Sequence, residues 1–195
     1  MNKLEGFLAL RESGLPAVPW KEYNKDTILD QDILWTIRSA VAQGEDLNLP
    51  RLIGVRAEEA KNFADDLLHT LEKKDLILYY PYFIALKSGV IDISMDRIVI
   101  EAVKEDLWNL VTYNKADVTI IFGNENLEFV GDESFLTQDE VYNLIDHCVV
   151  IKNKFRDQLK AGKSILLEWS FACKADINNA CAGNPSLVFY EIRTV

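Results

Sequence analysis

Apolar side chains recur at helical spacing in two long segments of the chain. Between 57 and 73 their offsets are 0, 3, 4, 7, 8 and 11, the pattern of an amphipathic helix, and the residues are Ala60, Phe63, Ala64, Leu67, Leu68 and Leu71. A second long helix is predicted from Thr137, where Glu140 completes a capping-box pattern, to Gly162. A shorter helix is expected over 3–13.

Short apolar runs rich in branched and aromatic residues predict that strands make up much of the remaining chain. Strands are expected over 33–37, 76–83, 88–93, 98–103, 118–122, 164–172 and 186–193. Segments 40–56 and 173–185 contain glycine and proline and are interpreted as loops. Segment 104–113 fits either a short helix or a bent strand.

No internal repeat and no linker rich in Pro, Gly or Ser interrupts this order of elements. We therefore expect one compact α+β unit over 1–195. Its N-terminal part, 1–75, holds one long helix and the strand that ends near Arg38, and its C-terminal part, 76–195, is rich in sheet.

Composition and charge narrow the classes of function. The 195 residues include 21 basic and 31 acidic side chains, and a net charge of −10 argues against a protein that binds the phosphate backbone of nucleic acids. A nucleotide remains open as a ligand, because a few local cations can hold it. No apolar run approaches the length of a membrane span, and the start turns polar too soon for a signal peptide. Cys148, Cys173 and Cys181 lack C-x-x-C spacing and are expected to be reduced thiols in a cytoplasmic protein.

Known catalytic motifs give little support to other chemistry. Segment 161–164 ends like a phosphate-binding P-loop, but Asp157 stands where that motif needs its first glycine, and the order runs from helix to strand. His69 and His147 lie off the apolar stripes of their helices and are expected at the surface. A hydrolase triad therefore has no basis in this sequence.

The last two predicted strands carry the candidate chemistry. Side chains alternate between the two faces of a strand, so one face of the final strand is expected to hold Leu187, Phe189, Glu191 and Arg193. If the two strands pair antiparallel with Ala172 opposite Leu187, then Glu168 lies opposite Glu191. In the alternative, the register differs and both glutamates face solvent.

Two carboxylates opposite each other destabilise a sheet and raise the pKa of one of them unless a positive charge compensates. Mg²⁺ is a natural partner, since it is usually held by one or two carboxylates together with phosphate groups of a substrate. Arg193, two residues beyond Glu191, would suit bidentate contact with a phosphate. In the alternative register, Arg193 is simply a surface partner of the glutamates.

The same two strands resemble the end of a known nucleotide-binding domain. Leu167-Glu168-Trp169 and Tyr190-Glu191-Ile192-Arg193-Thr194 are similar to the last motifs of the phosphoenolpyruvate synthase and pyruvate phosphate dikinase family. Further blocks in the family's order are Gly14–Pro19, Ile37–Ala40 followed by Glu45–Leu47, Ser88–Val90 and Ile98–Val103.

This resemblance implies an ATP-grasp-like fold with a mostly antiparallel sheet flanked by helices in two closely packed subdomains. It implies that Glu168 and Glu191 hold Mg²⁺ and that Arg38 and Arg193 act in catalysis. The nucleotide-binding set it implies is Lys3, Arg38, Glu101 and Arg193, with Glu101 reaching the ribose or adenine.

Two functions follow from the resemblance. In the first, the chain binds Mg-ATP and transfers a phosphoryl group to an acceptor that the sequence does not identify. In the second, it is a non-catalytic relative that acts as a binding or regulatory module with a partner protein subunit. The second rests on three features: Lys104–Leu107 stand where the family has glycines, region 40–88 is shorter than the family's, and the chain has an acidic balance of charge.

Overall fold

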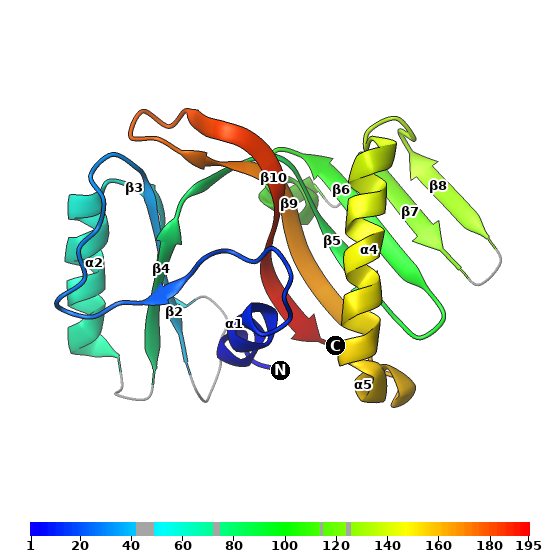
Figure 1. Ribbon diagram of the computed structural model, residues 1–195, viewed down its shortest axis with the longest axis horizontal. Helices are drawn as coiled ribbons and strands as arrows, with labels where there is room; N and C mark the ends of the chain where they lie inside the picture. The colour runs from blue at the N-terminus through cyan, green and yellow to red at the C-terminus, as the bar shows by residue number, and fades with distance from the viewer. Residues whose placement is uncertain (42–48, 72–74, 114, 124–125) are drawn as a thin grey trace.

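Two antiparallel sheets form the frame of the molecule, which we analysed as a computed structural model (Figure 1). The structure describes residues 1–41, 49–71, 75–113, 115–123 and 126–195. The predicted α+β class is confirmed, because the strands pair antiparallel in both sheets and helices flank them.

The smaller sheet has four strands in the order β1-β4-β2-β3. These strands are β1 (Lys21–Glu22), β2 (Trp35–Ala40), β3 (Arg51–Val55) and β4 (Leu76–Pro81). Helix α2 (Ala57–Thr70) covers the outer face of this sheet, on the left in Figure 1. Its apolar stripe is the predicted one: Ala60, Ala64 and Leu67 are buried with residues of β2 and β4.

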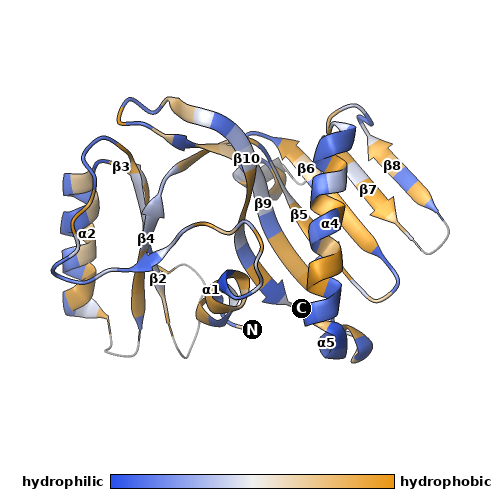
Figure 2. Ribbon diagram, in the orientation of Figure 1, coloured by the Kyte–Doolittle hydropathy of each residue, from blue (hydrophilic) through white to orange (hydrophobic). Residues whose placement is uncertain are grey.

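The larger sheet has six strands in the order β10-β9-β5-β6-β7-β8. They are β5 (Phe83–Ile93), β6 (Ile98–Lys104), β7 (Val118–Phe122), β8 (Leu127–Gly131), β9 (Ile165–Ala175) and β10 (Cys181–Thr194). The helices of this part are α3 (Trp108–Tyr113), α4 (Gln138–Lys154) and α5 (Arg156–Lys160). Figure 2 shows hydrophobic residues on β9 and β5, whereas α4, which lies across the sheet, carries hydrophilic and hydrophobic residues in turn.

Helix α4 confirms the predicted capping box, but the single helix expected from Thr137 to Gly162 is divided at Phe155 into α4 and α5. The Glu140 amide donates to Thr137 Oγ1 at 3.2 Å, and the Thr137 amide donates to Glu140 Oε2 at 2.8 Å. Leu144, Cys148 and Ile151 are fully buried against the sheet. The amphipathic pattern thus fixes which side of the helix faces the core.

Helix α1 (Lys3–Arg11) lies between the two sheets and packs on β10. A third apolar cluster joins α1 to both sheets, and its buried residues are Phe7, Val18, Trp20, Ala40, Leu78, Tyr80 and Val188. The N-terminal helix therefore fixes the small sheet against the last strand of the large one. The boundary expected near residue 75 stays a prediction.

Several segments differ from the elements predicted from the sequence. Segment 40–56, expected as a loop, contains β3, and β8 was not predicted at all. Both are edge strands with partly or largely exposed side chains, so neither shows the apolar alternation of a buried strand. Segment 173–185 is not a long loop, because β9 and β10 continue through most of it.

The prediction of reduced thiols is wrong for two of the three cysteines. Cys173 and Cys181 form a disulfide across the β9–β10 hairpin, with Cα atoms 5.5 Å apart. The disulfide was not predicted because 173–185 was interpreted as a loop, whereas the β9–β10 hairpin brings Cys173 and Cys181 together. Cys148 remains a thiol, and its burial between α4 and the large sheet raises its pKa to about 12.

We expect Cys181→Ser to lower the free energy of unfolding by about 2–3 kcal/mol, the entropic value for a short closed loop. Urea unfolding with and without dithiothreitol measures this effect. The reductant should destabilise the wild-type chain and leave Cys181→Ser unchanged. Equal wild-type stability under both conditions would contradict the expected contribution.

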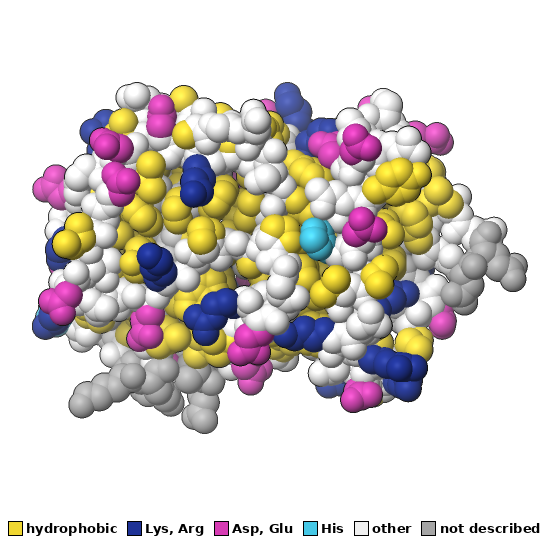
Figure 3. Space-filling view, in the orientation of Figure 1, with side chains coloured by type: hydrophobic (Ala, Val, Ile, Leu, Met, Phe, Trp, Pro, Cys, Tyr) yellow, Lys and Arg dark blue, Asp and Glu magenta, His cyan; other side chains and the backbone are white. Residues whose placement is uncertain are grey.

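None of the described helices has the length and apolar character needed to cross a membrane. On the face seen in Figure 3, basic and acidic side chains are interspersed with apolar ones. The acidic excess is therefore not gathered into one patch on this face. Of the two histidines, His69 is exposed, whereas His147 is half-buried, with its ring edge-on to Phe189 at 5.6 Å.

Candidate functional site

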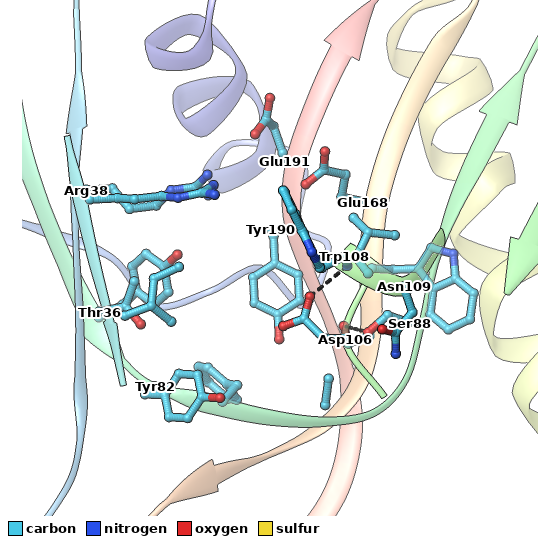
Figure 4. A pocket seen from close by; sticks show the side chains of 18 of the residues that line it. Thr36, Arg38, Tyr82, Ser88, Asp106, Trp108, Asn109, Glu168, Tyr190 and Glu191 are labelled. Atoms are coloured by element: carbon cyan, nitrogen blue, oxygen red, sulfur yellow. Dashed lines mark hydrogen bonds between the residues drawn. The ribbon is translucent and has the colours of Figure 1, made fainter. Parts of the chain in front are cut away.

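A cavity of about 610 Å³ lies between the two sheets. Strands β2 and β4 form one wall, strands β9, β10 and β5 form the other, and the segment around α3 forms part of the rim (Figure 4). Lys3 of α1 also lines it. Because its lining comes from sequence-distant elements, the cavity exists only once both sheets are assembled.

Five of the six residues predicted from the sequence line this cavity, namely Lys3, Arg38, Glu168, Glu191 and Arg193. Glu101 is not among the lining residues. It lies on β6 in the same cross-strand row as Glu168, separated from it by Val90, which pairs with both. Its predicted contact with a ribose or adenine remains a prediction. Glu45–Leu47, part of the sequence resemblance, lie outside the described residues.

Glu168 of β9 lies directly opposite Glu191 of β10, as the sequence predicted. The premise of that prediction was nevertheless wrong, because Ala172 pairs with Ser186 and not with Leu187. The upper part of the hairpin is therefore shifted by one residue from the expected register. A β-bulge between the two parts restores the pairing of the glutamates.

The extra residue of this bulge is Tyr190. Before it, Phe189 is fully buried in the core; after it, Ile192 is fully buried and Glu191 faces the cavity. The prediction that Phe189 and Glu191 share a face is therefore wrong. Without the bulge, strict alternation would have aimed Glu191 into the apolar core, so the bulge creates the carboxylate pair.

The two glutamates lie in a strongly charged environment. Glu191 is only 2% exposed and accepts a hydrogen bond from Arg193 Nε. Burial raises the pKa of Glu168, and the neighbouring Glu191 raises it further, against the opposing effect of Arg38, Arg193 and Lys3. The Glu168 carboxylate is therefore costly to hold ionised, even with these three cations around it.

Arginines form a second like-charged pair on the opposite wall. Arg38 of β2 lies directly opposite Arg51 of β3, and both line the cavity. Burial alone would lower the pKa of Arg38, but Tyr80, Glu191 and Glu168 raise it above its ordinary value. Figure 4 shows the Arg38 side chain directed across the cavity toward the two glutamates. Sequence analysis missed Arg51, because its strand was interpreted as a loop.

Hydroxyl groups line the cavity beyond the carboxylates. Ser88 of β5 and Ser170 of β9 are buried, with their Oγ atoms 2.7 Å apart. Ser88 Oγ also donates to the carbonyl oxygen of Glu105. Burial raises the pKa of Tyr190, which is hydrogen-bonded to Ser170. Hydroxyl groups therefore give this part of the cavity a polar lining.

The raised pKa of Glu168 predicts a stability that depends on pH. Between the ordinary glutamate pKa and the raised one, the folded chain binds more protons than the unfolded chain, so stability falls as pH rises. We expect Glu168→Gln to have a higher Tm than wild type at pH 8, with the difference vanishing toward about pH 4. Each kcal/mol corresponds to roughly 2–4 °C at this chain length.

Thermal unfolding from pH 4 to 8 without added nucleotide measures this difference. Glu128→Gln is the matched control, because Glu128 is exposed on the edge strand β8. Its Tm difference from wild type should not vary with pH in the same way. A Glu168→Gln variant less stable than wild type at pH 8 would contradict the expectation.

The described residues contain no group of three or more His, Cys, Asp or Glu side chains that could hold a metal ion on their own. Glu168 and Glu191 supply two carboxylates at one point. This set suits a cation that takes its remaining ligands from a bound phosphate and water, as Mg²⁺ commonly does.

Comparisons with known proteins do not support the resemblance found in the sequence. No protein-family model matches the chain, and no curated protein matches it. One solved structure with a similar arrangement is the macrocyclase MdnC, bound with precursor peptide MdnA, from Microcystis aeruginosa MRC. It shares 10% sequence identity at a TM-score of 0.46, covering 97% of this chain and 51% of that chain. This chain thus spans about half the length of that protein.

The expected kinship with phosphoenolpyruvate synthases and pyruvate phosphate dikinases is therefore wrong. The motifs behind it are short, and those on the last two strands alternate charged and apolar residues. Such patterns arise on any strand that has one face in a core and one face on a cavity. Five of the six residues that the resemblance implied still line one cavity, and this geometry does not depend on the kinship.

Proposed function

We propose that the cavity between the sheets binds a nucleoside triphosphate together with Mg²⁺, with ATP as the reference ligand. One observation carries the proposal: two like-charged cross-strand pairs, Arg38 with Arg51 and Glu168 with Glu191, line one cavity from opposite walls. Like charges directly opposite each other weaken a sheet. Two such pairs at one cavity favour a ligand that carries both an anion and a cation.

The carboxylate pair supports the metal part of this proposal. Glu168 and Glu191 come from adjacent strands, and burial, together with the charge of Glu191, raises the pKa of Glu168. A divalent cation beside them would compensate these charges. Glu191 is held in place by its hydrogen bond from Arg193, which fixes one donor oxygen before any ligand arrives.

The cations support the phosphate part. Arg38 approaches from the small sheet, Arg193 from the large sheet and Lys3 from the N-terminal helix. A guanidinium can contact two phosphate oxygens at once, whereas an ammonium acts as a point charge. A triphosphate bound among them would contact all three while sharing oxygens with the metal ion.

Such an arrangement also suits phosphoryl transfer, because that reaction depends mainly on positioning and on stabilising charge with cations. In this extension of the proposal, the terminal phosphorus of ATP bonds to an acceptor oxygen and ADP leaves with the electron pair of the broken P–O bond. The acceptor's proton passes to solvent. Release of ADP that requires Mg²⁺ and is abolished in Arg38→Ala would support this step; binding without any ADP release would restrict the protein to a binding role.

Isothermal titration calorimetry with ATP tests the binding proposal. We expect binding in MgCl₂ that is at least about tenfold weaker in EDTA, which corresponds to roughly 1.4 kcal/mol. Glu168→Gln should lose most of this dependence on Mg²⁺, because one of the two carboxylates is removed. The matched control Glu128→Gln should behave as wild type. Absence of ATP binding to the wild-type chain would overturn the proposal.

A further inference from the structure

Trp108 differs from the other tryptophans of the chain in its exposure. It is 61% exposed, whereas Trp20, Trp35 and Trp169 are each 8% exposed or less. The buried three each pack against another ring, in the pairs Trp20–Phe7, Trp35–Tyr79 and Trp169–Phe171. Within the described part of the chain, no such ring pair includes Trp108. Its large apolar surface is left available at the cavity that it lines.

The backbone turn that carries Trp108 is held by side-chain hydrogen bonds. Asp106 Oδ1 accepts from the amide of Trp108 at 2.7 Å. Asn109 Nδ2 donates to the carbonyl oxygen of Lys104 at 3.0 Å. Hydrogen bonds from residues on both sides of Trp108 thus stabilise the turn, and the indole ring makes neither of them.

Aromatic side chains surround the same end of the cavity. Tyr82 lines the cavity together with Asp106 and Trp108; burial raises the pKa of Tyr82, and the charge of Asp106 raises it further. Asp106 also contributes to the raised pKa of Tyr190, whose main cause is burial. Figure 4 shows Trp108, Tyr82 and Tyr190 around one space, with the two glutamates beyond it. Planar rings therefore border this end on both walls.

The aromatic end and the charged end are separate parts of one cavity. Ser170, which pairs with Ser88 next to the α3 turn, lies two residues along β9 from Glu168. Two residues of strand span about 7 Å. A ligand with phosphates at the glutamates would have to extend past the serine pair to reach Trp108.

We infer that Trp108 stacks on the base of the bound nucleotide and makes the site selective for nucleotides over inorganic polyphosphates. This inference rests on the proposed function and adds the residue that recognises the base. Stacking on an aromatic face favours any flat heterocycle and needs no hydrogen bond to its edge. An exposed indole at a cavity mouth gains most when such a ring covers it.

The test compares Mg-ATP with Mg-tripolyphosphate, which has the charges of the triphosphate but no base. Titration calorimetry should show ATP binding more tightly than tripolyphosphate to the wild-type chain. Trp108→Leu should weaken ATP binding by about 5- to 100-fold, as expected for loss of one stacked base, with tripolyphosphate binding unchanged. Trp108→Phe should restore part of the difference.

Tyr142→Leu is the matched control, because Tyr142 is an aromatic residue 58% exposed on α4, outside the cavity lining. It should bind both ligands as wild type does. Equal affinity of Trp108→Leu and wild type for ATP would overturn the inference while leaving the proposed function intact. Failure of both ligands to bind the wild-type chain would overturn the proposed function, and the inference with it.

Discussion

Arg38→Ala is expected to weaken binding of Mg-ATP by about 100-fold, which corresponds to about 2.7 kcal/mol. Hydrogen bonds to charged groups contribute roughly 1.5–3 kcal/mol each, and a guanidinium can form two to one phosphate. Arg38 is half-buried on β2 and also lowers the pKa of Glu168. Its removal therefore weakens the phosphate contact and leaves the carboxylate pair less compensated.

Titration calorimetry at saturating Mg²⁺ measures this loss. Arg38→Lys should recover only part of the affinity, because an ammonium group cannot make the two parallel hydrogen bonds to a phosphate that a guanidinium can. Arg97→Ala is the control, since Arg97 is an exposed arginine in the turn between β5 and β6. A loss below about threefold in Arg38→Ala would show that this guanidinium does not contact the phosphates.

The candidate site could be predicted from the sequence to the extent that strand alternation determines it. Placing Glu168, Glu191 and Arg193 together needed only two antiparallel strands and a register. The β-bulge at Tyr190 has no signal in the sequence, such as a glycine or proline at that point. The expected pairing was reached from a register that is wrong elsewhere in the hairpin. Bulges are set by tertiary packing, here by the need to bury both Phe189 and Ile192.

The residues that sequence analysis missed lie on elements with weak patterns. Arg51 belongs to a short edge strand, and Trp108 to a helix of six residues. Neither element has enough apolar positions to show a helical or strand-like periodicity of hydrophobic residues. Helices α2 and α4 were predictable for the opposite reason, because each buries one continuous stripe over several turns. Chemistry on short elements becomes visible only once the fold places them at a cavity.

Gly89→Ala is expected to destabilise the fold by about 3 kcal/mol or more, at the upper end of the usual cost of overpacking. Gly89 lies in the middle of β5, paired with Ala102 on one side and Trp169 on the other. A methyl group there would overlap the carbonyl oxygen of Glu101 and come within 2.6 and 2.8 Å of the Trp169 ring. Neither neighbour can yield easily, because Glu101 is held in the sheet and Trp169 is fully buried.

Thermal unfolding followed by circular dichroism measures this loss, which corresponds to a Tm lower by roughly 6–12 °C at this chain length. Gly123→Ala is the control, because the nearest described atom to a methyl group there is 3.7 Å away. Its Tm should stay within about 2 °C of wild type. Gly89 lies between Ser88, which lines the cavity, and Val90, which pairs with Glu168. Any Gly89→Ala protein that folds should therefore also bind Mg-ATP more weakly. If both Tm and affinity stayed unchanged, β5 and β6 would leave room for a methyl group at position 89, and the expectation would be wrong.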